Sequence, residues 1–370
     1  MEGITPIVMP KWGLSMKEGK VVSWLVEEGT RITVGMPILE VETDKIANDV
    51  EAPDAGLLRR RVAQDGETLP VKALLGVMAE TTVSDADIDA YVSAYETPAA
   101  GDETDADANA YQQIEVDGIR VRYARKGATA GTPVLFIHGF GGDLDNWLFN
   151  LDAVSERVPT LALDLPGHGQ SELRLPGTSL AALAAFVVHF LDAVDEPRAH
   201  LVGHSMGGAI AAQVALDFPA KVASLTLIDS AGMGSDINAG YLEGFVQAQS
   251  RRELKPVLEQ LFADPNLVSR QMIDELLKYK RLDGVASLLA SLAGSLFSGG
   301  RQASTPVLQL APDSLPVLVL WGREDRVISA GHAAHAPAGA GVHVFEQAGH
   351  MLQLERASEV NRLILALVAA

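Results

Sequence analysis

Residues 203–208 are Gly-His-Ser-Met-Gly-Gly, and they connect an apolar run at 201–202 to a helical stretch at 209–217. A strand, a G-x-S-x-G turn and a helix in this order are typical of a nucleophile elbow, which lifts the serine above the sheet. Small residues at 203 and 207 allow the close approach of strand and helix that such a turn requires. The pattern therefore predicts that Ser205 is a nucleophile.

Two further side chains follow Ser205 in the order serine, aspartate, histidine. Asp325 comes after an apolar run at 317–320, and His350 comes after one at 342–345. A serine hydroxyl is a poor nucleophile until a histidine accepts its proton, and that histidine needs a carboxylate to fix its tautomer and stabilise its charge. We expect His350 as the base and Asp325 as the acid. Asp229, at the end of another expected strand, is the alternative acid.

Backbone amide groups beside Ser205 are expected to stabilise the oxyanion. His138-Gly139-Phe140-Gly141-Gly142 directly follows the apolar run at 134–137. The loop there can aim the Phe140 amide at a developing negative charge, beside the amide of Met206. We expect these two amides to form an oxyanion hole.

The other histidines form two groups. Glycine-rich loops need polar side chains that satisfy backbone groups, so a structural role is expected for His138, His168 and His204. No metal-like spacing with acids accompanies the second group, and a surface position is expected for His332, His335 and His343.

Apolar runs alternate with helical stretches throughout this part of the chain, which is typical of a doubly wound α/β fold. The runs expected to be buried parallel strands are 134–137, 161–163, 201–202, 225–228, 317–320 and 342–345. Between 230 and 316 the sequence has only helical periodicity, which predicts a helical cap at about 231–312. Within it, Arg251, Arg252 and Lys255 either contact a phosphate group of a cofactor or form a solvated helix face, and the second interpretation is the simpler one.

The N-terminal region repeats itself. Residues 3–79 are short β-type runs that match at an offset of 37 positions, as Gly29 matches Gly66 and Ile38 matches Leu75. Two similar halves predict a small barrel or sandwich with pseudo-two-fold symmetry. Glu42-Thr43-Asp44-Lys45-Ile46-Ala47 lies midway between the two repeated turns, so Lys45 is expected at an exposed hairpin tip.

An acidic segment separates the two regions. Residues 80–113 contain nine Asp or Glu and no Lys or Arg, which predicts a flexible linker between domains at 1–79 and 114–370. A short helix at 85–95 is the alternative for part of it, because four apolar residues recur there at intervals of three or four: Ile88, Tyr91, Val92 and Tyr95.

The composition excludes several classes of function. A net charge of -19 repels phosphate backbones and anionic headgroups, which argues against nucleic-acid or membrane binding. Without cysteine there is no disulfide, cysteine-ligated zinc or thiol nucleophile. The sequence also shows no signal-peptide pattern, and we expect a soluble cytoplasmic enzyme.

Two sets of motifs resemble known families. Residues 42–47, with Met9-Pro10-Lys11-Trp12-Gly13, resemble the lipoyl domains of 2-oxo acid dehydrogenase complexes. Biotin carriers differ, because methionines flank their lysine whereas Asp44 and Ile46 flank Lys45. The elbow and the loop at 164–171 resemble α/β-hydrolases. The combination resembles the dihydrolipoamide acetyltransferase components of acetoin dehydrogenase complexes.

The resemblance implies a flattened lipoyl barrel followed by a capped α/β-hydrolase domain, with lipoate on Lys45 and coenzyme A (CoA) as the acyl acceptor. The implied partners are a thiamine-diphosphate-dependent acetoin-cleaving component, dihydrolipoamide dehydrogenase and a lipoate-attaching enzyme. Ser205 is then expected to pass an acetyl group from the lipoyl arm to CoA.

Two alternatives stay open. The hydrolase half is an esterase, thioesterase or C–C bond hydrolase that uses water as acceptor, or it is an inactive scaffold in a lipoyl carrier subunit.

Overall fold

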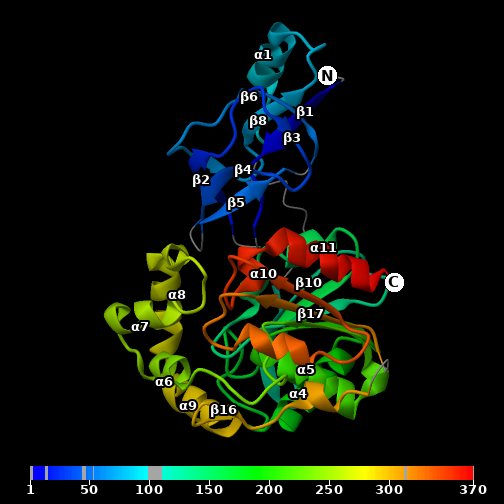
Figure 1. Cartoon of the computed structure of the whole chain (residues 1–370), viewed down its shortest axis with the longest axis vertical. Coiled ribbons are helices and arrows are strands. Elements are labelled where there is room, and N and C mark those ends of the chain that lie inside the picture. The colour runs from blue at the N-terminus through cyan, green and yellow to red at the C-terminus, as the bar shows by residue number, and fades with distance from the viewer. Residues whose placement is uncertain are drawn as a thin grey trace. The chain divides into compact units, whose positions relative to one another are not determined.

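The computed structural model describes residues 3–12, 16–43, 47–52, 54–98, 111–311 and 315–369. The chain divides into two compact units, residues 1–108 and 109–370 (Figure 1).

Two four-stranded sheets form the first unit, with strand orders β1-β8-β6-β3 and β5-β4-β2-β7. The strands are β1 Ile4–Val8, β2 Glu18–Trp24, β3 Arg31–Ile32, β4 Pro37–Glu42, β5 Ala47–Glu51, β6 Gly56–Arg61, β7 Thr68–Pro70 and β8 Leu74–Ala79. Fully buried apolar side chains fill the core between them, including Ile38, Leu39, Val41, Leu58 and Leu75. The predicted all-β fold is confirmed.

The 37-residue repeat relates the two sheets. It carries β2 onto β6, β3 onto β7 and β4 onto β8, so three strands of one sheet match three strands of the other. The same relation holds for single hydrogen bonds, since the Gly29 amide donates to Leu58 O at 2.7 Å and the Gly66 amide donates to Val21 O at 2.7 Å. Both glycines have φ values near +85°, at 88° and 83°, which glycine adopts without strain. The repeat in the sequence therefore corresponds to a pseudo-two-fold axis that relates the two sheets.

Lys45 itself lies outside the described residues. The flanking strands β4 and β5 pair as an antiparallel hairpin up to Glu42 opposite Ala47, and position 45 belongs to the connection between them.

A helix occupies part of the segment expected to be a flexible linker. This helix, α1, spans Asp85–Ala94, and the side chain of Ser84 caps it by accepting from the Asp87 amide. Ile88 is fully buried against β8, while Arg59 pairs with Asp85 at 2.7 Å. The expectation of a linker across 80–113 is thus wrong at this end, because the segment has an apolar stripe and acids that match basic residues of β6. At the other end, strand β9 already begins at Tyr111.

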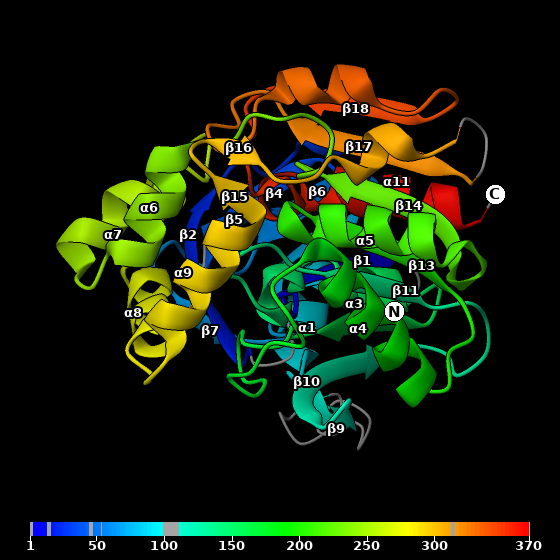
Figure 2. The same ribbon diagram turned by 90° about the horizontal axis from the view of Figure 1, so that it is seen from below.

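The second unit contains an eight-stranded sheet in the order β18-β17-β14-β13-β11-β12-β10-β9 (Figure 2). Its strands are β9 Tyr111–Val116, β10 Ile119–Lys126, β11 Val134–Ile137, β12 Thr160–Leu163, β13 Ala199–His204, β14 Val222–Ile228, β17 Val317–Gly322 and β18 Gly341–Phe345. The six expected parallel strands are present, and β11, β13, β14 and β17 are parallel neighbours. The predicted doubly wound sheet is confirmed.

Helices cover both faces of this sheet. Figure 1 shows α4 (Leu180–Ala193) and α5 (Met206–Asp217) on one face and α11 (Ala357–Val368) on the other. The edge hairpin of β9 and β10 is antiparallel and was not predicted, because charged side chains interrupt its apolar pattern. One of them, Arg122, is buried and pairs with the buried Asp164 at 2.7 Å.

Four helices form the cap beside the sheet (Figure 2). They are α6 Ala239–Gln247, α7 Arg251–Leu258, α8 Arg270–Lys280 and α9 Val285–Leu296, followed by the short strands β15 Phe297–Ser298 and β16 Arg301–Gln302. Side chains of Asn238, Ser250 and Ser269 cap the starts of α6, α7 and α8. Buried residues such as Leu254, Leu277 and Leu289 form the apolar side of the cap.

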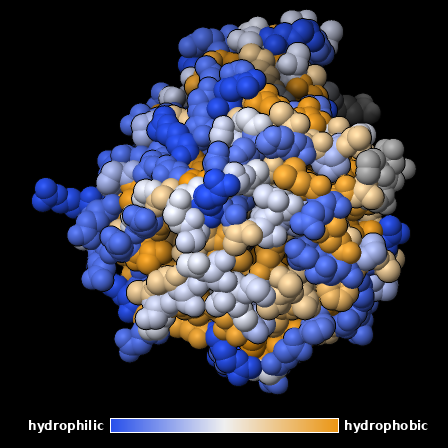
Figure 3. All heavy atoms as spheres, turned by 60° about the horizontal axis from the view of Figure 1, so that its bottom comes forward, coloured by the Kyte–Doolittle hydropathy of each residue, from blue (hydrophilic) through white to orange (hydrophobic). Residues whose placement is uncertain are grey.

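The surface carries apolar residues scattered among hydrophilic ones, as the face in Figure 3 shows. Such single exposed residues are normal for a folded chain. None of the helices in the described ranges is both long and apolar enough to cross a lipid bilayer.

Candidate active site

Ser205 occupies a strained turn between β13 and α5. Its backbone has φ 52° and ψ -118°, a conformation that costs a non-glycine residue on the order of 1–3 kcal/mol. The Ser205 amide donates to Ile228 O of the neighbouring strand at 3.0 Å, which anchors the turn to the sheet. A Cβ atom at Gly207 would lie 2.1 Å from Ile137 O, so the turn can form only with glycine there.

His350 and Asp325 are bonded to each other. His350 Nδ1 lies 2.8 Å from Asp325 Oδ2, and the two side chains are 3% and 0% exposed. The second carboxylate oxygen accepts from the amides of Val327 and Ile328 at 2.7 and 2.9 Å. These donors fix the carboxylate, which in turn orients the ring and leaves its Nε2 atom for proton transfer.

Asp229, the alternative acid, has different partners. It is fully buried, and it accepts hydrogen bonds from the backbone amides of Gly322 at 2.8 Å and Leu352 at 3.3 Å. Burial, and then the charge of Asp325, raise the pKa of this carboxyl group well above its ordinary value. The partner of His350 is therefore Asp325, while Asp229 links the end of β17 to Leu352, two residues after His350.

His204, the residue before Ser205, packs against the loop that carries His350. The ring centroids of His204 and His350 are 4.9 Å apart, and His204 Nε2 lies 2.7 Å from His350 O. The His350 amide also donates to Leu261 O of the cap at 2.8 Å. The residue next to Ser205 thus contacts the loop that carries His350.

The loop after β11 lies beside Ser205. A Cβ atom at Gly139 would be 3.1 Å from Ser205 Cβ. The ring of Phe140 packs against Phe245 and Phe297 of the cap, with centroids 5.7 and 6.3 Å away. Met206 is the first residue of α5, where a backbone amide has no acceptor within its helix. Both amides remain candidates for the oxyanion hole.

Three histidines near the site are fully buried and neutral. His138 Nε2 accepts from the Leu165 amide at 3.0 Å, and its Nδ1 lies 2.8 Å from Gly139 O. Burial lowers the pKa of His138 to about 4 and that of His168 to about 3. The pKa of His204 is also well below its ordinary value, first through burial and then through His350. Their contacts with loop backbone fit the structural role expected from the sequence.

The expectation of a surface position is wrong for His332. It is 7% exposed, and its ring packs edge-on against Trp321 with centroids 6.3 Å apart. His335 and His343 are exposed as expected, and His335 Nδ1 lies 2.8 Å from Met233 O. A short helical turn, Ala330–His335, packs against β17 and buries the ring of His332. The described residues contain no cluster of three side chains that would hold a metal ion.

Acid should destabilise the second unit because these buried histidines resist protonation. Their folded pKa values lie below the ordinary 6.5, so the unfolded chain binds more protons and stability falls as pH drops below about 6.5. Only the pH unit between 6.5 and 5.5 counts, so His138 and His168 should each cost about 1.4 kcal/mol, and together about 3 kcal/mol, between pH 7.5 and 5.5. Urea unfolding followed by tryptophan fluorescence measures this change.

A matched pair of variants checks the assignment. His138→Gln keeps an acceptor for the Leu165 amide and cannot become charged, so it should reduce the pH-dependent loss by about 1.4 kcal/mol. His343→Gln, at an exposed position, should leave the loss unchanged. Equal pH dependence in all three proteins would contradict the prediction.

Comparisons with known proteins cover both units. Residues 132–357 match the family of the alpha/beta hydrolase fold, and residues 5–78 match a family described as biotin-requiring enzyme. A protein of Cupriavidus necator, the dihydrolipoyllysine-residue acetyltransferase component of an acetoin cleaving system, is 64% identical over 98% of this chain and 96% of its own. The protein with the same description from Pseudomonas putida is 48% identical over 99% of both chains.

Solved structures match the second unit. A meta-cleavage product hydrolase from Pseudomonas fluorescens superposes with a TM-score of 0.62 at 24% identity, covering 69% of this chain and 96% of its own. At this identity the likeness extends to the fold alone.

Proposed function

Because this chain belongs to the family of dihydrolipoyllysine-residue acetyltransferase components of acetoin cleaving systems, we propose that Ser205, His350 and Asp325 carry the acetyl transfer. The enzyme is an acyltransferase with covalent lipoate, and it moves an acetyl group to CoA within a multienzyme system. The single observation that supports the triad most directly is the 2.8 Å contact between His350 Nδ1 and Asp325 Oδ2.

The hairpin of β4 and β5 fits the attachment of a prosthetic group at Lys45. Its strands pair up to Glu42 opposite Ala47, the residues that precede and follow Lys45 in the sequence. When bound there, lipoate presents the acetyl group as a thioester on a long arm. Since α1 packs on this unit, we place the end of the carrier domain after α1 rather than at residue 79.

The first chemical step acylates the serine. Ser205 Oγ attacks the thioester carbonyl carbon while His350 Nε2 takes the hydroxyl proton. The amides of Phe140 and Met206 stabilise the negative charge on the carbonyl oxygen. The C–S bond then breaks, and His350 returns its proton to the departing thiolate.

The second step reverses these roles with CoA as the nucleophile. His350 accepts the CoA thiol proton, the sulfur attacks the acyl carbon, and the C–O bond to Ser205 breaks with its proton restored. Asp325 stabilises the charged imidazole in both steps. Water is the competing nucleophile, and aromatic packing of Phe245 and Phe297 of the cap on Phe140 supports a site that excludes it.

The proposed partners follow from the family and from the lipoyl arm, which has to be attached, acetylated and reoxidised. They are a thiamine-diphosphate-dependent component that cleaves acetoin, dihydrolipoamide dehydrogenase and a lipoate-attaching enzyme. The chain has no cysteine, which is compatible with the cytoplasm, where we place it. We assign it no nucleic-acid or membrane partner.

A single-turnover reaction tests the function. The lipoylated protein is reduced, acetylated on its arm and mixed with saturating CoA, and the products are separated by chromatography. We expect acetyl-CoA as the main product. Lys45→Arg keeps the charge but cannot carry lipoate, so it should yield no product from its own arm. Free acetate as the main product would support a hydrolase instead, and a stable acetylated arm would support an inactive scaffold.

A further inference from the structure

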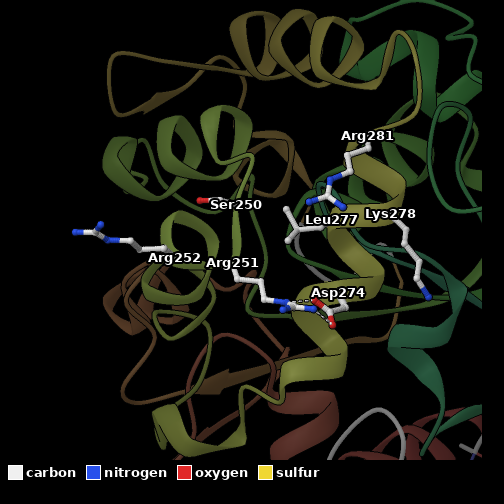
Figure 4. Close-up of a pocket in the computed structure, with 7 residues that line it drawn as sticks. All are labelled: Ser250, Arg251, Arg252, Asp274, Leu277, Lys278 and Arg281. Atoms are coloured by element: carbon white, nitrogen blue, oxygen red, sulfur yellow. Dashed lines mark hydrogen bonds and ion pairs between the residues drawn. The ribbon is translucent and has the colours of Figure 1, made fainter.

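A cavity of about 580 Å³ lies in the cap, between α7 and α8, and the residues of the triad do not line it. The residues that line it are Ser250, Arg251, Arg252, Asp274, Leu277, Lys278 and Arg281 (Figure 4). Four of the seven are cationic and one is acidic. In a chain of net charge -19, such a hollow is a local site for an anionic ligand.

One ion pair joins α7 to α8, and the three other cations at the cavity have no ion pair among the described residues. Arg251 reaches across to Asp274 and makes a bidentate contact with its carboxylate (Figure 4). Arg252, Lys278 and Arg281 are exposed and make no ion pair with any described residue. In Figure 4 the Arg281 guanidinium points toward Leu277, while Arg252 and Lys278 extend outward on different sides. The three cationic groups therefore lie on different sides of the cavity.

The other charged side chains of α7, Lys255 and Glu253, have partners outside the cavity. Lys255, also singled out in the sequence, pairs with Glu259 at 3.6 Å and does not line the cavity. Glu253 accepts from the Gln249 amide at 2.9 Å, and this bond lowers the pKa of its carboxyl group.

Helix α7 connects the cavity to the histidine of the proposed triad. The helix begins at Arg251, and the turns after it continue to Leu261, whose carbonyl oxygen accepts from the His350 amide at 2.8 Å. The eight-residue helix Arg251–Leu258 covers about 12 Å of that path, at 1.5 Å per residue. The chain of CoA between its diphosphate and its thiol has the backbone length of about four residues and spans about 14 Å when extended, which is comparable with the length of the helix.

Helix α8 connects the other wall to the loop of Phe140. Lys280 contacts the carbonyl oxygens of Phe245 and Val246, and its ammonium group lies 4.9 Å from the Phe245 ring centroid. Phe245 in turn packs against Phe140. Both walls of the cavity thus contact elements of the candidate active site.

We propose that this cavity binds the 3′-phosphate and diphosphate of CoA, with Arg252, Lys278 and Arg281 as the cations that contact them. Arginine suits this role, because its guanidinium binds phosphate bidentately and stacks on flat rings such as adenine. Arg251 is not counted among them, because its guanidinium is already paired with Asp274. The proposal rests on the proposed function, since it assigns a site to the acceptor of that reaction.

Steady-state kinetics with two acceptors test the site. Arg252→Gln combined with Arg281→Gln should raise the KM for CoA by about tenfold for each cation removed, with kcat unchanged. The KM for pantetheine, which has the thiol but no phosphate, should be the same in wild type and variant. Lys255→Gln, on the same helix but outside the cavity, is the control and should leave both KM values unchanged.

Three results would overturn the proposal. If the wild type forms acetyl-CoA but the double variant keeps its KM for CoA, the cavity is not the site and the proposed function stands. If the KM for the acetylated carrier domain rises instead, the cavity is a docking site for that acidic domain. If the wild type releases only acetate, the proposed function fails together with this site.

Discussion

Replacement of Ser205 by alanine is expected to lower acetyl transfer to CoA by about 10⁶-fold, because the residues of a nucleophilic triad act as a unit. The side chain at 205 supplies the only hydroxyl at the elbow, between Gly203-His204 and Met206-Gly207. Alanine has the same backbone strain as serine at φ 52°, so the free energy of unfolding should change little. Rapid-quench measurement of acetyl-CoA formation from the acetylated arm determines the rate.

A second buried serine provides the control. Ser230 lies at the end of β14, is fully buried, and donates from its hydroxyl to Ala231 O at 2.6 Å. Ser230→Ala removes a buried hydroxyl without removing the proposed nucleophile, and its rate should stay within a few-fold of wild type. Transfer that persists in Ser205→Ala at the wild-type rate would contradict covalent catalysis at this residue and would favour direct attack of CoA on the thioester.

Replacement of Asp325 by asparagine is expected to lower kcat by about 10⁴-fold, since an amide stabilises the wrong tautomer of the histidine. The Asp325 carboxylate accepts from His350 Nδ1, from Trp321 Nε1 at 3.1 Å and from two backbone amides. In the asparagine variant an amide NH2 group takes the place of Oδ2, so it presents a hydrogen-bond donor to His350 Nδ1, which is itself the donor in the wild type. The ring then turns or keeps its proton on Nε2, and it can no longer accept the proton of Ser205.

Asp229→Asn is the matched variant. Asp229 accepts from two backbone amides and does not contact the ring, and burial already favours its neutral form. We expect at most a tenfold fall in kcat, through displacement of the strand ends. A larger loss in Asp229→Asn than in Asp325→Asn would transfer the role of the acid to Asp229.

The sequence predicted the parts of this protein that depend on short segments. The elbow at Ser205 needs glycine at 203 and 207, and this requirement is visible in six consecutive residues. The barrel repeats every 37 residues because each half folds into the same strands, so its symmetry is also present in the sequence. The assignment of Lys45 as the attachment site stays a prediction, which rests on that repeat and on the motif around it.

Tertiary structure decided what depends on contacts between distant segments. Asp229 and Asp325 both follow strands, and only the arrangement of β14, β17 and the His350 loop brings one of them to the ring. Helix α1 docks because β8 presents an apolar face and β6 presents arginines, neither of which the acidic segment itself reveals. His332 is buried for the same reason, by packing against Trp321. The cationic cavity forms where α7 and α8 meet. The sequence of a helix determines which of its own side chains share a face, but only packing determines which residues of another helix lie opposite them.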